Sequence, residues 1–147
     1  MLLGTAFAMV VLSVAAVACN DDDEANGGEG APVDVSLLEY TVAPDPASVA
    51  AGPVTFNANN IGGVDHQLVI IRSDLAPDAL PTAEDGSADE AGEGIEVLGK
   101  IENLAAGDTG AVTLDLDAGA YVLICNIVDA GGAHYNLGMT AAFTVTE

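Results

Sequence analysis

The sequence predicts an all-β fold, a two-sheet sandwich with Greek-key connections. Short runs rich in Val, Ile, Leu, Thr and aromatic residues recur along the chain, and Gly, Pro and Asp separate them. No sustained helical period of three to four residues appears. The 147 residues suffice for one compact domain with a real core and are too few for two ordinary domains.

Six of these runs are expected to be strands, each rich in residues that favour pleated structure. They are 33–40, 54–58, 67–72, 111–116, 121–126 and 142–146. In one of them Val112, Leu114 and Leu116 alternate with Thr113 and Asp115, and this period of two gives one buried and one wet face.

Segment 74–94 interrupts the pattern of short strands. It contains Pro77, Pro81 and seven acidic residues. We expect a long acidic surface insertion with room for one short helical turn.

The charge balance excludes whole classes of partner. Two basic residues, Arg72 and Lys100, stand against 23 acidic ones, giving a formal net charge of -21. Nucleic acid is excluded because no basic surface could displace its counterions. An anionic membrane surface is disfavoured for the same reason, so any membrane attachment has to be covalent. We expect a self-repelling monomer, suited either to a salty environment or to a basic partner.

The amino terminus has the features of an export signal. Residues 2–18 are apolar and uncharged, and they end in small residues just before Cys19. We therefore expect residues 1–18 to be a cleaved signal peptide. The run Ala16-Val17-Ala18-Cys19 resembles the lipobox of bacterial lipoproteins, which implies a lipid on Cys19 and a mature chain that begins there. An uncleaved membrane anchor is the alternative, although the run is short for a span.

Residues 19–32 are rich in Asp, Glu, Gly and Asn and have little to bury. We expect them to be a disordered acidic tether that leads to a domain at 33–147.

Potential soft metal ligands are few and clustered. Beyond Cys19, the only histidines, cysteine and methionine are His66, Cys125, His134 and Met139. Two imidazoles, a thiolate and a weak axial thioether form the donor set of an electron-transfer copper site. Cys125 closes an apolar strand, and the next two donors lie in the loop that follows it. His66 begins another strand, which Greek-key pairing could bring alongside.

The segments around these donors resemble the two copper-binding segments of cupredoxins, the blue copper proteins. The matching runs are Asn60-Ile61-Gly62 before His66, then Cys125-Asn126 and His134-Tyr135-Asn136-Leu137-Gly138-Met139. The resemblance covers roughly residues 33–147 and is greatest to plastocyanin-like exported proteins. Eight residues separate Cys125 from His134, a longer loop than in plastocyanin or azurin and similar to that of copper nitrite reductases.

The resemblance implies one type 1 copper ion, with Cys125 as the strong thiolate ligand. His66 and His134 would be the equatorial imidazoles, and Met139 the long axial ligand. It also implies a one-electron carrier outside the cytoplasmic membrane, not an enzyme, that serves a cytochrome or oxidase. Electrons would leave through the edge of His134, as the ligand nearest to solvent. The expected docking rim around it consists of Gly62, Gly63, Ala133 and Leu137. Tyr135 is either a further member of this rim or packs against the ligand loop, and we expect it to pack.

Three alternatives stay open at this point. The chain could be a copper chaperone or store, or a metal-free accessory module of an exported complex. A disulfide between Cys19 and Cys125 is also possible in an exported protein. Nitrite reductases and multicopper oxidases need further histidine-rich centres, which two histidines cannot supply. Hydrolytic zinc sites need motifs that the chain lacks.

Overall fold

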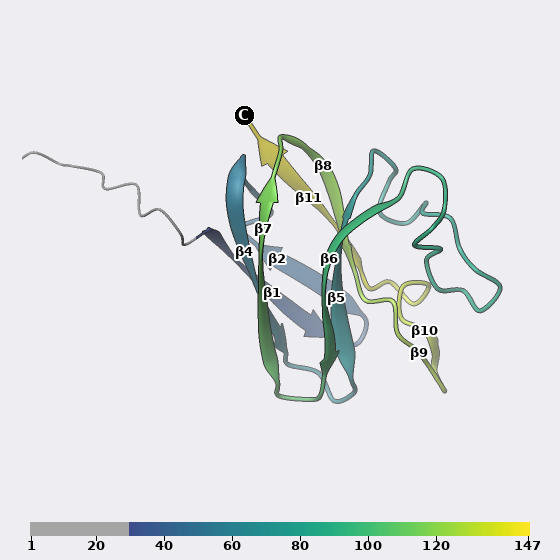
Figure 1. Ribbon diagram of the computed structural model, residues 1–147. Helices are drawn as coiled ribbons and strands as arrows, with labels where there is room; N and C mark the ends of the chain where they lie inside the picture. The colour runs from purple at the N-terminus through teal and green to yellow at the C-terminus, as the bar shows by residue number, and fades with distance from the viewer. Residues whose placement is uncertain (1–29) are drawn as a thin grey trace, which may run out of the picture.

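Eleven strands run through residues 30–147, the part of the chain that the computed structural model describes (Figure 1). They are β1 (Ala31–Leu38), β2 (Thr41–Asp45), β3 (Ser48–Ala50), β4 (Gly52–Asn60), β5 (His66–Arg72), β6 (Glu96–Leu104), β7 (Thr109–Leu116), β8 (Gly119–Ile124), β9 (Val128–Asp129), β10 (Gly132–Ala133) and β11 (Thr140–Thr146). This part of the chain contains no helix, so the predicted all-β class is confirmed. Consequently no helix in it could cross a membrane.

The strands form two packed sheets and one small hairpin. One sheet has the order β2-β1-β4-β7, the other has the order β3-β11-β8-β5-β6, and β9 pairs with β10. Pairing is antiparallel except between β1 and β4 and between β3 and β11. All six predicted strands are present with shifted ends. β1 begins at Ala31, two residues before the strand predicted at 33–40.

The hydrophobic core lies between the two sheets. In β1, Val33, Val35 and Leu37 are fully buried and alternate with more exposed residues, as a period of two requires. The rings of Phe56 and Phe143 meet edge to face across the core, with centroids 5.3 Å apart. Such aromatic contacts add to the free energy gained from area burial alone.

Strand β6 was not predicted, because its sequence mixes charged residues with a central glycine. Gly99 lets β6 approach β7 at the edge where the sheets meet, since a β-carbon there would lie 3.0 Å from the Leu114 side chain. Sequence patterns rarely mark such an edge strand, because glycine and charge weaken the usual strand signal.

The insertion covers the outer face of the second sheet instead of extending into solvent (Figure 1, right). Its Leu80 and Ala88 are buried in a second apolar cluster with Val69, Ile71, Val122, Ile124 and Tyr135. The expected helical turn is absent, and its only regular pairing is a bridge between Thr82 and Ala88. Six of its seven acidic residues remain exposed, so it is acidic outside and apolar beneath.

Candidate metal centre

The pairing of β5 with β8 brings the first two candidate ligands together. His66 is the first residue of β5, and Cys125 follows the last residue of β8. The two strands are antiparallel, with Val69 opposite Ile124, so these ends lie at the same end of the sheet. His134 arrives from the loop after β10. One ligand atom from each of the three residues lies within 4.8 Å of the others.

Both imidazoles turn their Nδ1 atoms toward the same sulfur. The Cys125 Sγ atom lies 3.4 Å from Nδ1 of His134 and 3.8 Å from Nδ1 of His66. The two rings are 5.2 Å apart at an interplanar angle of 64°. All three residues are fully buried. Two nitrogen donors and one sulfur donor therefore surround one position that is buried from solvent.

Met139 is fully buried and belongs to the same apolar cluster as Cys125. Its backbone is hydrogen-bonded to the backbones of Cys125 and His134. The carbonyl of Met139 accepts the N–H of Cys125 at 3.1 Å, and its N–H donates to the carbonyl of His134 at 3.0 Å. The loop thus closes on itself, with both its ends at the donor cluster.

Burial sets the protonation of these groups. It raises the pKa of the Cys125 thiol, although the N–H of Gln67, 3.4 Å from the sulfur, opposes this effect. It lowers the pKa of His66, and the neighbouring His134 lowers it further, while Glu39 acts in the opposite direction. A dry pocket therefore favours the neutral groups. A bound cation would reverse the preference of the thiol, because a coordinating thiol gives up its proton.

The outer nitrogens of the two rings face carboxylates. Nε2 of His134 lies 3.1 Å from Oδ2 of Asp129, a hydrogen-bonding distance. Nε2 of His66 lies 3.4 Å from Oε1 of Glu39, yet among the described residues it has no hydrogen-bond partner. Glu39 instead accepts the backbone N–H groups of Gly63 and Val64 and so holds the loop before β5. The pKa of Glu39 is lowered, first by its own backbone N–H and then by those of Val64 and Gly63.

The insertion holds the ligand loop from outside. The Asn126 side chain accepts the N–H of Ala88 at 2.7 Å and donates to its carbonyl at 3.0 Å. The Tyr135 hydroxyl accepts the N–H of Leu80 and donates to the carbonyl of Pro77, each at 3.0 Å. Sequence reasoning missed these contacts, because nothing in the acidic segment indicates which backbone groups meet the loop.

The expected docking rim is wrong at Ala133, which is buried, whereas Tyr135 is buried as its expected packing requires. His134 is fully buried like the other three predicted donors, so exposed area does not single it out as the ligand nearest to solvent. The Tyr40 ring packs edge-on against His134, with centroids 5.3 Å apart. Of the expected rim residues, Gly63 and Leu137 are exposed and Gly62 is half-buried.

Three large exposed apolar side chains lie outside the expected docking rim, in the loop before β5 and in β9: Ile61 (61 % exposed), Val64 and Val128. Leu137, in the ligand loop, is exposed as expected. We call these four residues the apolar rim.

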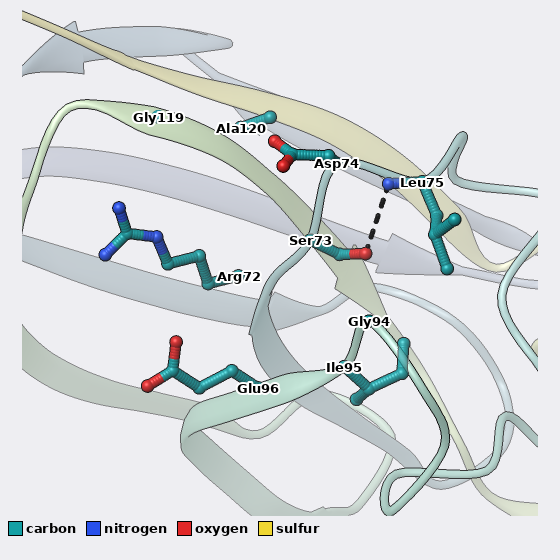
Figure 2. Close-up of a pocket in the computed structure, with 9 residues that line it drawn as sticks. All are labelled: Arg72, Ser73, Asp74, Leu75, Gly94, Ile95, Glu96, Gly119 and Ala120. Carbon is teal, nitrogen blue, oxygen red and sulfur yellow. Dashed lines mark hydrogen bonds between the residues drawn. The ribbon is translucent and has the colours of Figure 1, made fainter.

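A pocket of about 460 Å³ lies away from this cluster (Figure 2). It is lined by residues that include Arg72 at the end of β5 and Gly119 at the start of β8. Those strand ends are opposite to the ones that carry His66 and Cys125, roughly 20 Å along the strand. Inside it the Ser73 hydroxyl accepts the N–H of Leu75. The pocket contains no histidine, cysteine or methionine, so it is not part of the donor cluster.

Cys19 and the expected signal peptide at 1–18 lie outside the described residues, as does most of the expected tether at 19–32.

No protein-family model matches the chain, and no curated protein matches it in sequence. Solved structures do. Auracyanin from Roseiflexus castenholzii is 20% identical over 82% of this chain and all of its own, with a TM-score of 0.56. Auracyanin A from Chloroflexus aurantiacus, a blue copper protein, is 21% identical over 80% of this chain and 99% of its own (TM-score 0.53). Rusticyanin from Thiobacillus ferrooxidans is 19% identical over 81% of this chain and 79% of its own (TM-score 0.50).

These likenesses establish the fold. The expected cupredoxin-like β-sandwich is confirmed, and the donor cluster of His66, Cys125 and His134 lies within it.

The hydroxyl of Tyr135 provides a test of the contact between insertion and ligand loop. Tyr135→Phe leaves the buried N–H of Leu80 without its acceptor, so the free energy of unfolding should fall by about 1–3 kcal/mol. Amide hydrogen exchange should speed up at Leu80, as measured by NMR. Tyr121→Phe is the control, because it removes a single hydroxyl bond, to the carbonyl of Asp117. Unchanged exchange at Leu80 in Tyr135→Phe would show that the insertion is held by apolar packing alone.

Proposed function

We propose that this protein is a one-electron carrier that holds a single type 1 copper ion. The observation that carries the proposal is the placement of two Nδ1 atoms 3.4 and 3.8 Å from one buried thiol, at one end of a cupredoxin-like sandwich. Copper, when bound, supplies the exchange of one electron between its two oxidation states. Cys125, His66 and His134 would be the strong ligands and Met139 the weak axial one.

The surroundings of the donors suit electron transfer better than substrate chemistry. All four predicted donor residues are fully buried, so none of them offers an exposed surface to a substrate. This burial supports a carrier over an enzyme. The ligand loop is hydrogen-bonded internally and to the insertion, so its donors can stay in place when the charge of the ion changes. Small movement of ligands lowers the barrier to electron exchange.

The partner that we propose is a redox protein with a basic face, such as a cytochrome or an oxidase. Two features of the surface support it. The net charge of -21 creates a negative field, and the apolar rim offers an uncharged contact near the buried ligands. Val128 and Leu137 of this rim lie within the loop that carries His134.

We further propose that the domain works outside the cytoplasm, held by a lipid on Cys19. The lipobox-like run Ala16-Val17-Ala18-Cys19 and the charge-free apolar run before it support this location.

Copper binding can be tested by adding copper(II) to the purified protein and recording visible spectra. The wild type should develop an intense blue thiolate band, and Cys125→Ser should lose it, because the hydroxyl cannot replace the thiolate. Met139→Leu is the graded comparison: it keeps an apolar side chain of similar volume, so the blue band should persist while the reduction potential rises. A weak, colourless complex in the wild type would indicate copper handling, and no binding would indicate an accessory module.

Electrostatic steering predicts a salt-dependent rate. The second-order rate of electron transfer to a basic cytochrome should fall as ionic strength rises and the screening length drops below about 10 Å. Stopped-flow measurements across a salt series would show it, with an acidic cytochrome as the control that should give the opposite trend. A rate that stays flat or rises with the basic cytochrome would leave the apolar rim as the recognition surface.

Lipid attachment predicts that Cys19→Ser releases the domain from membranes. Intact-mass analysis of the native mature chain should find acyl mass on an amino-terminal Cys19. A mature chain that begins downstream of Cys19 and carries no acyl mass would show ordinary secretion instead.

A further inference from the structure

The β9–β10 hairpin places one carboxylate against the outer edge of His134. Asp129 is the last residue of β9, and its Oδ2 atom lies 3.1 Å from Nε2 of the imidazole. Its other oxygen, Oδ1, accepts the N–H of Gly131 at 2.7 Å. The carboxylate is thus oriented by its own hairpin, with one oxygen for the backbone and one for the ring.

The two imidazoles of the cluster differ in this respect. Nε2 of His66 lies 3.4 Å from Glu39, but that carboxylate oxygen is taken up by two backbone N–H groups, and the nitrogen remains without a hydrogen bond within the described part of the chain. His134 therefore has a positioned carboxylate, and His66 has only a neighbouring negative charge.

Resting on the proposed copper site, we propose that Asp129 is a positioning residue for His134. Its carboxylate accepts the Nε2–H of the imidazole, which leaves Nδ1 as the nitrogen with the free lone pair. That nitrogen is the one 3.4 Å from the Cys125 sulfur. A carboxylate behind a metal-binding histidine fixes the tautomer and ring orientation and makes the imidazole a stronger donor. A stronger donor favours the more highly charged oxidised ion, so Asp129 lowers the reduction potential.

Two observations indicate a built contact instead of a chance one. An acidic residue in a chain with a net charge of -21 is repelled by its neighbours, yet one oxygen of this exposed carboxylate is held 3.1 Å from the Nε2 atom of a fully buried ring. The pKa of Asp129 is lowered, first by its hydrogen bond to His134 and then by the N–H of Gly131. The ionised form is thereby favoured at the position where it faces the imidazole.

The tautomer can be tested on the full chain without copper. Nitrogen-15 NMR of the metal-free protein should show His134 protonated at Nε2 and not at Nδ1, with slow exchange of that proton. Asp129→Ala should speed the exchange and mix the tautomers, while Asp115→Ala, an exposed acid on β7 of the other sheet, should change neither. Protonation at Nδ1 in the wild type, or identical spectra of His134 in wild type and Asp129→Ala, would overturn the proposal.

The charge effect is tested by Asp129→Asn in the copper-loaded full chain. The amide oxygen can still accept the Nε2–H, so only the negative charge is lost. We expect the redox equilibrium with a reference couple to shift about tenfold toward the reduced form, which is about 59 mV for one electron. Asp115→Asn removes the same charge far from the ring and should shift it much less. Equal shifts in the two variants would overturn the proposed role.

The two experiments separate the inference from the function on which it rests. If the wild type bound no copper, the carrier function would fail, and the tautomer measurement would still decide whether Asp129 positions His134. If copper bound and gave a blue protein while the variants behaved alike, the function would stand and the role of Asp129 would fall.

Discussion

The pairing of β5 with β8 is the constraint on which the rest of the site depends. His66 and Cys125 are 59 residues apart in sequence, and this pairing brings Nδ1 of the histidine to 3.8 Å from the cysteine sulfur at one end of the sandwich. Because these strands lie inside the five-stranded sheet, with β11 on one side and β6 on the other, their ends are fixed by the core and not by the loops. A slip of one residue would turn every side chain to the opposite face and separate the donors.

The other two predicted donors, His134 and Met139, lie on a loop, and loops are normally the mobile part of a β-sandwich. Here the backbone of Met139 is hydrogen-bonded to the backbones of Cys125 and His134, so the loop is closed internally. The insertion forms further hydrogen bonds to the loop through Asn126 and Tyr135. The insertion is thus part of the structure that supports the site. Its acidic residues keep its outer surface soluble, while Leu80 and Ala88 attach it to the sheet.

The sequence was sufficient for the six strands and for the cluster of His66, Cys125 and His134, because both leave local signals: period-two runs in the first case, and rare side chains at characteristic spacing in the second. It was insufficient wherever partners come from distant backbone. β6 carries a glycine and charges, and only its neighbours make it a strand. Asp129 looks like any other acid until the hairpin directs it at His134. Ala133 was expected at the docking surface because the sequence does not show that the insertion packs against the ligand loop there.

On the proposed function, the acidic residues divide into two groups with different physics. Glu39 and Asp129 are themselves exposed, but their oxygens lie 3.4 and 3.1 Å from the Nε2 atoms of fully buried imidazoles, a separation far shorter than the Debye length of about 8–10 Å. Their charges favour the oxidised ion and so make the reduced protein a better electron donor. The acids of the insertion and turns are solvated, and salt screens them within a Debye length. Salt should therefore change the association rate with a partner far more than it changes the reduction potential of the bound ion. The rate of encounter and the driving force for electron transfer thus depend on different acidic residues of the same domain.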